Sequence, residues 1–388
     1  MISLLAKIFI KKDGVNTKQV RKAYGSLCSI VGICLNVLLF GIKYFAGTIS
    51  GSIAITADAF NNLSDAGSSF ITLVGFWYAG KKPDLEHPFG HGRFEYVSGF
   101  VVSMAILLMG AELARTSVDK IIHPQAIDTS NLAMTILVIS IAVKVYMAFY
   151  NKKIGKKIGS AAMEATSMDS LSDTVATTVV LIAMVVMRCT GVNIDGICGV
   201  LVAVFILYAG YNAAKETISP LLGKVPETDF VDQIEQIVMS HEGILGTHDL
   251  IVHDYGPGRV MISLHAEVPG NGTIYELHDK IDLIERELKE KLGCEAVIHM
   301  DPIEVDNELV TMVRKQVAER LKNVEETLTI HDFRMVTGPT HTNLIFDIVV
   351  PYNIKFADEE IAEKVQEQIQ RLDASYIAVI NIDKFYVK

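Results

Sequence analysis

The chain has 388 residues, of which 50% are hydrophobic and 21% are charged, and its mean hydropathy of +0.33 is too high for an ordinary soluble protein of this size. This composition indicates a membrane protein. Residues 1–219 carry 19 Lys and Arg against 14 Asp and Glu, a balance of +5, whereas residues 220–388 carry 16 against 31, a balance of −15. Because the polar half is acidic and the overall pI is near 5.6, nucleic acid is excluded as a partner.

Six segments are long and apolar enough to cross a membrane, since a spanning helix needs about 20 mainly apolar residues. They are residues 24–46, 52–79, 96–118, 131–150, 161–187 and 194–214. The chain after Pro220 is too polar to span. The sequence therefore predicts a polytopic α-helical membrane protein with six transmembrane helices, followed by a polar C-terminal part.

Positive charge gathers on one side of these spans: before the first, after the second and after the fourth. The opposite loops are nearly free of Lys and Arg. By the positive-inside rule, both termini are cytoplasmic and the protein is a multi-pass protein of the cell membrane. The residues concerned are Lys11, Lys12, Lys18, Arg21, Lys22, Lys81, Lys82, Arg93, Lys152, Lys153, Lys156 and Lys157.

The first ten residues are mostly apolar and could be taken for a signal peptide. The run ends at Lys11 and Lys12 without a small-residue cleavage site, so we interpret it as a short amphipathic lead-in. The five cysteines form no CxxC pair, and four of them lie in apolar stretches. We therefore expect reduced, mostly buried thiols and neither a disulfide framework nor a thiolate zinc cluster.

The polar part contains an internal repeat with an offset of 82 or 83 residues. His248-Asp249-Leu250 and a Gly-Pro turn recur as His331-Asp332-Phe333 and a second Gly-Pro turn. Each copy predicts an amphipathic helix, two alternating strands, a second helix and a last strand. The helices are expected at 227–241 and 274–292, then at 306–322 and 358–372, with last strands at 296–299 and 377–380. This order resembles βαββαβ, the split βαβ unit with helices on one face of a sheet.

Polar residues lie inside the second and fifth spans, where a charge at the helix centre costs about 2.5–3.5 kcal/mol. Asn61 and Asp65 are four residues apart, as are Asp169 and Asp173, so each pair lies on one helix face. If the faces meet, they surround a point with one amide oxygen and three carboxylates, which is a site for a cation that prefers oxygen. The alternative, that the polar groups only hold the helices together, is poor for the aspartates, stays open for Asn61, and is favoured for Asp58.

The loop between the second and third spans carries Asp84, His87 and His91 within eight residues. Two imidazoles and a carboxylate are enough for an open three-ligand metal site. Spacing alone is a weak signal, and a polar interfacial loop that Pro and Gly hold in place explains the same residues. Both interpretations stay open.

The first copy of the repeat is rich in histidine, and together these residues make a candidate binuclear metal site. They are His248, His265, His278, His299 and Asp301. The second copy places His331, Asp347, Glu360, Asn381 and Asp383 near the equivalent positions. Because four imidazoles have become one, we do not expect a similar site there.

These motifs resemble those of the cation diffusion facilitators, a family of six-span exporters of divalent metals. The resemblance covers residues 20–304 and rests on several motifs in the correct order. They are Ala57-Asp-Ala-Phe-Asn-Asn-Leu-Ser-Asp65, His87-Pro-Phe-Gly-His-Gly-Arg-Phe-Glu95, Glu112, Ile121-Ile-His-Pro124 and Asp169-Ser-Leu-Ser-Asp173.

The resemblance implies a homodimer with a cytoplasmic ferredoxin-like domain, here duplicated. It implies four regions: a cytoplasmic segment at 1–22, a transport domain at 23–219, a metal-binding domain at 220–304 and a second repeat at 305–388. It places the transported ion on Asn61, Asp65, Asp169 and Asp173, a loop site on Asp84, His87 and His91, and a cytoplasmic site on the histidine set with Asp301. A structural or regulatory Zn²⁺ suits the cytoplasmic site, and no catalytic cofactor is expected.

Two departures from the family pattern matter. Zinc-transporting members usually carry His in the fifth span and often in the second, where this chain has Asp169 and Asn61. The pattern is similar to that of manganese transporters. Most members also end after one ferredoxin-like domain, so residues 305–388 are an addition that the resemblance does not explain.

The predicted function is therefore Mn²⁺ efflux in exchange for protons by alternating access, with the ion bound between the second and fifth spans. The partners are the lipid bilayer, divalent cations, protons and a second copy of the chain. The alternatives are a Zn²⁺ or Fe²⁺ exporter of the same family and a membrane-anchored metal sensor, which the intramembrane aspartates disfavour. An enzyme is not expected, since a metalloprotease motif such as HExxH does not occur in the sequence.

Overall fold

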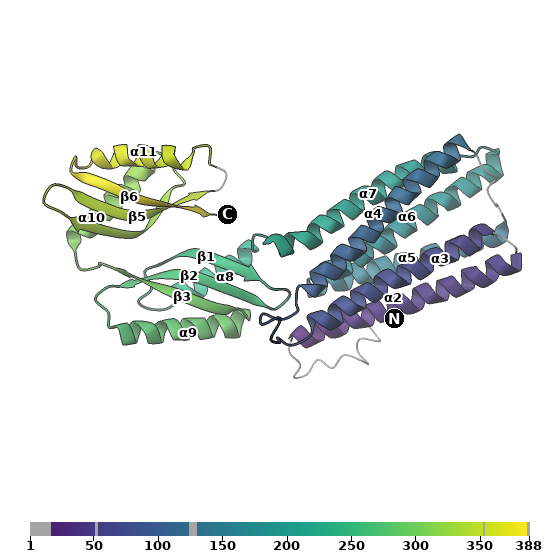
Figure 1. Ribbon diagram of the computed structural model, residues 1–388, viewed down its shortest axis with the longest axis horizontal. Helices are drawn as coiled ribbons and strands as arrows, with labels where there is room; N and C mark the ends of the chain where they lie inside the picture. Colours follow the sequence, from purple (N-terminus) through teal and green to yellow (C-terminus); the bar gives the residue numbers. More distant parts are fainter. Residues whose placement is uncertain (1–16, 51–52, 124–129, 352–353, 386–388) are drawn as a thin grey trace. The chain divides into compact units, whose positions relative to one another are not determined.

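Long helices make up the first part of the chain, and small sheets with helices make up the second (Figure 1). The computed structural model describes residues 17–50, 53–123, 130–351 and 354–385. The amphipathic lead-in predicted for the first ten residues lies outside them. The chain divides into one compact unit of Met1–Lys224 with Asp254–Arg259, and a second of Val225–His253 with Val260–Lys388.

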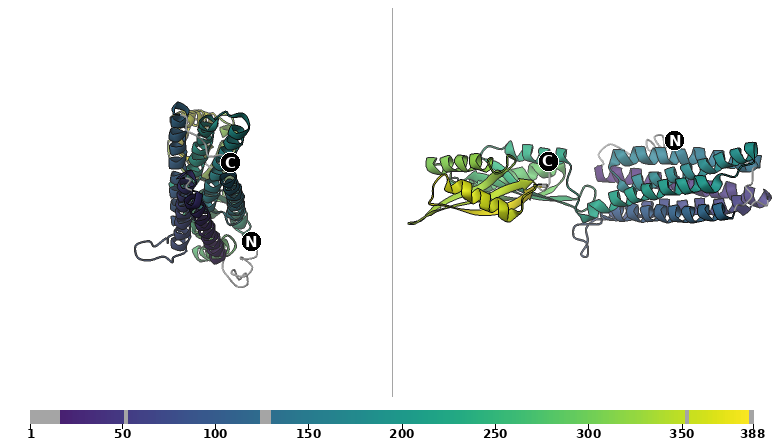
Figure 2. Two further views of the ribbon diagram at one scale, coloured as in Figure 1. Left: turned by 90° about the vertical axis from the view of Figure 1, so that its right-hand side faces the viewer. Right: turned by 90° about the horizontal axis from the view of Figure 1, so that it is seen from above.

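In its described residues, the first unit is a bundle of six long helices that run side by side (Figure 2). They are α2 (Thr17–Ser50), α3 (Ile53–Ala79), α4 (Phe94–Ile122), α5 (Asn131–Ile158), α6 (Ala161–Thr190) and α7 (Asp195–Leu222). Five of them, α2 and α4 to α7, are long and apolar enough to cross a membrane. The sixth, α3, has 27 residues and contains Asn61, Asn62 and Asp65.

Serine and glycine residues cap the two ends of helices α5 and α6. The Ser160 side chain accepts a hydrogen bond from the Met163 amide and begins α6, and Gly191, with a φ of 73°, ends it. Ser130 and Gly159 do the same for α5, whose N-terminal cap bond comes from Ala133. These caps satisfy backbone groups that would otherwise have no partner at the helix ends.

The helices pack mainly in three pairs. In two of them, α2 with α3 and α5 with α6, the helices are neighbours in sequence, whereas α4 and α7 are far apart in sequence. Gly99 of α4 lies where a Cβ atom would come within 3 Å of Thr217 and Ala162, so only glycine permits this approach. An ion pair between Arg21 and the fully buried Glu95 joins α2 to α4, with Arg21 Nη2 at 2.8 Å from Glu95 Oε1. Such pairing is what a buried carboxylate requires.

The second unit contains the two predicted repeats, each with its own three-stranded sheet (Figure 1). The first repeat comprises α8 (Thr228–Met239), β1 (Gly246–Asp254), β2 (Val260–Pro269), α9 (Ile274–Leu292) and β3 (Glu295–Ile303). The second comprises α10 (Glu308–Leu321), β4 (Thr329–Thr337), β5 (Thr342–Pro351), α11 (Asp358–Gln370) and β6 (Tyr376–Phe385). The strand orders are β1-β2-β3 and β4-β5-β6, and β3 and β6 each lie parallel to the middle strand.

The order within each repeat differs from βαββαβ in one respect. The first strand of that order has no counterpart among the described residues, because 223–227 enter α8 without forming a strand. Each repeat is therefore αββαβ, and the parallel pairing of the last strand with the middle one is kept.

Each repeat has its own hydrophobic core. The β5 side chains alternate between buried and partly exposed, so every second residue packs on α10 and α11. The repeats also contact one another through Glu267, which is 3% exposed and lies 3.1 Å from Arg314. The second repeat thus supplies the counter-ion for a buried carboxylate of the first repeat.

The cysteines only partly match the expectation. All five are free thiols, and Cys28 and Cys294 are buried. Cys34 and Cys189 are exposed, so the expectation of mostly buried thiols was wrong. Apolar residues on the outer face of a membrane bundle lie against lipid, and apolar surroundings in sequence therefore do not imply burial inside the protein.

Candidate metal centres

Helices α3 and α6 bring the three predicted intramembrane aspartates together. Asp65 comes from α3, and Asp169 and Asp173 are one turn apart on α6. Each offers one carboxylate oxygen, and these three oxygens lie within 4.8 Å of one another. Asp65 and Asp169 are buried, at 6% and 4% exposure. Carboxylates this close together and this far from water need a positive charge beside them.

Lys144 of α5 supplies that charge, and the sequence analysis missed it. Its Nζ donates to Asp65 Oδ2 at 2.6 Å and to Asp173 Oδ2 at 2.7 Å. The sequence did contain an indication of its role: a lysine inside the predicted fourth span costs as much free energy in the membrane as an aspartate does. Lys43 of α2 is a second buried lysine of this kind, and it lines the cavity described next.

A cavity of about 620 Å³ lies beside these groups. Its lining includes Asp65, Asp173 and Lys144, together with Asn61 of α3 and Glu112 of α4. A water molecule takes about 30 Å³ in the liquid, so the cavity can hold an ion with many waters. The structure thus places the predicted Asn61 on the same cavity as the aspartates, on the exposed side of α3. The Asp58 side chain lies outside the described part of the chain.

A direct hydrogen bond joins the two helices that carry the aspartates. Thr72 Oγ1 of α3 and Thr166 Oγ1 of α6 lie 2.9 Å apart, and both residues are buried. Ser170, between Asp169 and Asp173, is also buried and adds little bulk. Hydrogen bonds and small residues of this kind hold membrane helices close together, so the three carboxylates stay near one point.

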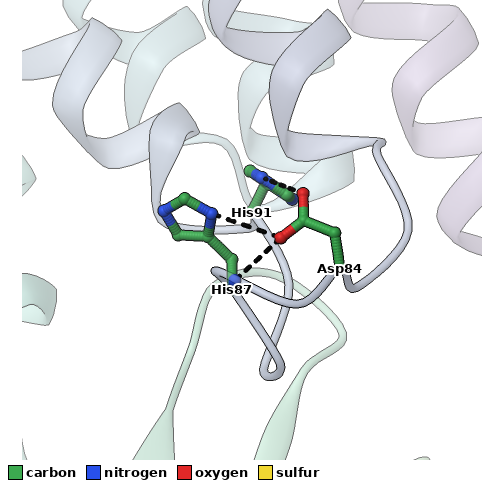
Figure 3. A group of neighbouring side chains, drawn as sticks. All are labelled: Asp84, His87 and His91. Atoms are coloured by element: carbon green, nitrogen blue, oxygen red, sulfur yellow. Dashed lines mark hydrogen bonds and ion pairs between the residues drawn. The ribbon is translucent and has the colours of Figure 1, made fainter.

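The loop after α3 brings Asp84, His87 and His91 together (Figure 3). Asp84 Oδ1 lies 3.4 Å from His87 Nδ1, and Asp84 Oδ2 lies 3.3 Å from His91 Nε2. A hydrogen bond from the His87 amide to Asp84 Oδ1, at 2.7 Å, keeps the pKa of Asp84 below its usual value. The carboxylate is thus charged and lies between two imidazoles, an arrangement that can hold a divalent metal.

The same compact unit includes the segment Asp254–Arg259, which holds this loop in place. Arg259 Nη2 donates to the Lys81 carbonyl oxygen at 2.8 Å, and the Tyr255 ring stacks on Phe89 with centroids 4.6 Å apart. The loop is therefore supported on both sides of His87. This support would keep the three ligands in place for a metal, and it is equally consistent with a polar loop that Pro and Gly hold in place.

In the first repeat, neighbouring strands bring four of the five predicted ligands together. His248 lies on β1, His265 on β2, and His299 and Asp301 on β3. Asp301 Oδ2 lies 2.9 Å from His265 Nδ1 and 3.1 Å from His248 Nε2, and Asp301 Oδ1 lies 3.4 Å from His299 Nε2. The pairing of His265 with His299 in the β2 and β3 register explains why their rings meet.

A fifth group in this cluster, Asp249, was not identified from the sequence. Its Oδ2 lies 4.0 Å from His265 Nδ1. Asp249 has a φ of 52°, and Asp332, its equivalent in the second repeat, has a φ of 49°. Aspartate tolerates this left-handed conformation better than most residues. The recurrence of the His-Asp pair was the available signal.

The structure does not bring His278 into this cluster. It lies on α9, is 66% exposed, and has its Nδ1 at 3.8 Å from Asp282 Oδ1. Helix α9 packs on β3 through residues such as Ile281, Ile284 and Leu288, and His278 does not belong to that buried face. Its role as a ligand stays a prediction.

Burial prepares His248 for metal binding. It lowers the pKa of His248, and the imidazole of His331 beside it lowers that pKa further. The ring is therefore neutral at physiological pH, which is the form that binds a metal ion. Three imidazoles beside two carboxylates make a ligand set that suits Zn²⁺.

We expect this histidine cluster to bind Zn²⁺ more tightly than Mn²⁺, because imidazole nitrogens favour the later metals. Replacing His299 with alanine should weaken Zn²⁺ binding by about 10- to 100-fold, the range seen when the surroundings of a metal ligand are changed. The measurement is competition with a chromophoric chelator, using the full chain in detergent. His241→Ala is the matched control, since His241 lies 2.8 Å from Glu287 and away from the cluster. Equal affinities for the His299 variant and the unmodified chain would count against His299 as a ligand.

Six membrane helices with charged residues around an internal cavity, followed by a second unit with a histidine cluster, define a class of membrane transporter for cations. Comparison with known families agrees. Residues 29–222 match the cation efflux transmembrane domain, and residues 226–303 match the cytoplasmic domain of cation efflux proteins. The chain belongs to the cation efflux, or cation diffusion facilitator, family.

Individual relatives support the same assignment. An uncharacterized transporter of Methanocaldococcus jannaschii is 31% identical over 279 residues, which are 72% of this chain and 97% of that protein. Cation-efflux pump FieF of Escherichia fergusonii is 26% identical over 288 residues, and that of Salmonella typhi is 27% identical over 288 residues; each match covers 73% of this chain and 96% of the relative. The two family domains end at residue 303, so the second repeat lies beyond them. The protein is thus a multi-pass membrane protein for divalent metal cation efflux.

Proposed function

We propose that this transporter exports Mn²⁺ in exchange for protons, with the ion bound between α3 and α6. The observation that carries the proposal is the group formed by Asp65, Asp169 and Asp173, whose oxygens lie within 4.8 Å of one another inside the bundle. Every one of these ligands offers oxygen. With Asn61 on the same cavity, the set suits Mn²⁺, which accepts a shell of carboxylate, amide and water oxygens.

The absence of imidazole from this ligand set is the basis for selectivity. Zn²⁺ binds more tightly than Mn²⁺ at almost any shared site, so a protein that prefers Mn²⁺ must withhold the nitrogen and sulfur ligands that Zn²⁺ favours. Among the described residues of α3 and α6, each ligand of this acidic group is an aspartate.

Proton exchange is supported by the charge of the same group. Three carboxylates with one contacting lysine carry a net charge of −2 when all are ionised, and one divalent ion neutralises it. When the ion leaves, the excess negative charge in a buried site becomes costly, and protonation of the aspartates relieves that cost. Release of the metal and uptake of protons are therefore expected to be linked.

Orientation and assembly complete the proposal. The positive charges of the loops after α3 and α5 support a cytoplasmic position for those loops and for both termini. The matched cytoplasmic domain supports a homodimer. Transport then consists of inward-facing binding, a rocking movement of the bundle, and release on the outer side. A structural or regulatory Zn²⁺ in the first repeat fits the histidine cluster described above.

The test is metal flux into vesicles containing the purified protein. At equal free metal concentrations and with an imposed pH gradient, we expect Mn²⁺ to move faster than Zn²⁺. Collapsing the gradient with a proton ionophore should slow Mn²⁺ flux, because the driving exchange is lost. Protein-free vesicles are the control for leakage. Faster movement of Zn²⁺ would overturn the argument from ligand hardness, and flux that does not respond to the gradient would overturn proton exchange.

One observation favours a second candidate, a zinc exporter of the same family. The cytoplasmic cluster contains His248, His265 and His299, which are ligands that Zn²⁺ prefers. If this cluster senses the exported ion, the cargo is Zn²⁺. The same flux experiment separates the two candidates.

A further inference from the structure

A second group of ligands lies in the second repeat, where the sequence led us to expect none. His331 of β4, Asp347 of β5 and Asp383 of β6 come together with Asp249, which belongs to β1 of the first repeat. Each offers one ligand atom, and these four atoms lie within 4.8 Å of one another. That expectation considered the second repeat alone, whereas the fourth group comes from the other repeat.

His331 points to a ligand for this group. The residue is 5% exposed, and neither of its ring nitrogens has a hydrogen-bond partner among the described residues. Its Nε2 faces two carboxylates, at 3.4 Å from Asp383 Oδ2 and 3.8 Å from Asp249 Oδ1. Asp383 Oδ2 is likewise buried and without a hydrogen bond within the described part of the chain. Buried polar atoms normally have partners, so orphaned atoms that face one another indicate a missing ion or water.

The charge of the group indicates a cation. Three carboxylates face a single imidazole, and their mutual repulsion adds to burial in raising the pKa of Asp347 and Asp383 above its usual value. A divalent cation at the centre would bind the free oxygens and His331 Nε2 together, and would neutralise charge that the protein leaves uncompensated.

The sheet positions of this group repeat those of the histidine cluster with harder ligands. Asp347 stands opposite Asn381 in the β5 and β6 register, as His265 stands opposite His299 in β2 and β3. Asp383 corresponds to Asp301. Two imidazoles of the first repeat have therefore become a carboxylate and an amide at matching places. Oxygen ligands favour Mn²⁺, Mg²⁺ or Ca²⁺, and one imidazole among them favours Mn²⁺ within that set.

We propose that Asp249, His331, Asp347 and Asp383 form a divalent-cation site that the two repeats share, with a ligand set that suits Mn²⁺. Asp249 bridges this site and the histidine cluster, since its Oδ1 faces His331 and its Oδ2 faces His265. The rings of His248 and His331 stack with centroids 3.9 Å apart, so the two sites are adjacent. A metal that binds in the second repeat thereby draws the repeats together and orients a ligand of the first site.

The test counts Mn²⁺ bound to the full chain in detergent, with Asp169→Ala present so that the intramembrane aspartates do not contribute. Free Mn²⁺ is read from its electron paramagnetic resonance signal during titration. Adding Asp383→Asn should reduce the bound ions by one per chain. Asp332→Asn is the matched control, because Asp332 pairs with Arg334 at 2.7 Å and lies outside the group; it should leave the count unchanged. Equal counts with and without Asp383→Asn would overturn the proposal.

A second variant guards against misfolding. His331→Gln should remove a nitrogen coupling from the electron spin echo of bound Mn²⁺, which a purely structural role for His331 would not predict. The melting temperature of each variant in the presence of chelator shows whether it folds. If the nitrogen coupling keeps its full intensity per bound Mn²⁺ in folded His331→Gln, His331 is not a ligand and the site is refuted. Because binding is measured in a background without the proposed transport site, this result does not depend on whether the protein exports Mn²⁺.

Discussion

Replacing Asp169 with alanine is expected to abolish metal transport while the protein remains folded and dimeric. The change removes one of the three carboxylates between α3 and α6, and few other ligands stand nearby to replace it. Initial flux in vesicles should fall by more than about 100-fold, since even changes around a ligand cost about 10- to 100-fold. Asp65→Ala and Asp173→Ala should behave in the same way, whereas Asp58→Ala should be milder.

The matched control for these variants is Asp119→Ala. Asp119 lies on α4, is 62% exposed, and pairs with His123 one turn away. It is an aspartate in a helix of the same bundle but outside the acidic group, and its removal should leave flux near that of the unmodified protein. Size-exclusion chromatography and a thermal melt report whether each variant is intact. Full flux through an intact Asp169→Ala protein would remove the intramembrane site from the mechanism.

Replacing Asp169 with histidine should change which metal is transported. An imidazole supplies the nitrogen ligand that Zn²⁺ prefers and removes an oxygen that Mn²⁺ uses, so zinc flux should rise and manganese flux should fall. A change of about tenfold in the ratio corresponds to about 1.4 kcal/mol of differential binding, which is modest for exchange of a direct ligand. Asn61→His, on the cavity beside the aspartates, should add to the shift.

This experiment needs flux of both metals measured on the same vesicles. Asp169→Asn is the informative comparison, because it removes the charge but keeps an oxygen. It should lower flux of both ions without moving the preference toward Zn²⁺. If Asp169→His changes both fluxes by the same factor, ligand type does not set selectivity here, and the preference must come from the geometry of the cavity.

Much of the fold could be predicted from the apolar spans and from the internal repeat in the sequence. Apolar length predicted the helices of the bundle, and the recurrence of His248-Asp249 at His331-Asp332 located the second repeat. The same reasoning predicted the five elements of each repeat in their observed order, and only the likeness to βαββαβ, which adds a first strand, went beyond them. The exposed Cys34 shows a related limit, since hydropathy does not separate a residue that faces lipid from one that faces a neighbouring helix.

The candidate sites show where spacing along one element stops being informative. Asp169 and Asp173 are paired by helix periodicity alone, and Asp84, His87 and His91 by a short loop. Lys144 and Asp249 were not predicted as site residues. Lys144 becomes important only when α5 lies beside α3 and α6, and Asp249 only when the sheet of one repeat lies beside the sheet of the other. Such contacts depend on tertiary packing, and a single sequence records them only as a charged residue in an unfavourable place.

The ion pairs of Lys144 bear on which ions the carrier can accept. A tethered ammonium already occupies the position between Asp65 and Asp173, so an arriving ion must compete with it. A sodium or potassium ion brings no more charge than the lysine and has no advantage in that contest, although such ions are abundant in cells. A doubly charged ion does have one. If the ion binds to these aspartates as proposed, we expect the lysine to disfavour monovalent ions before the finer choice among metals is made.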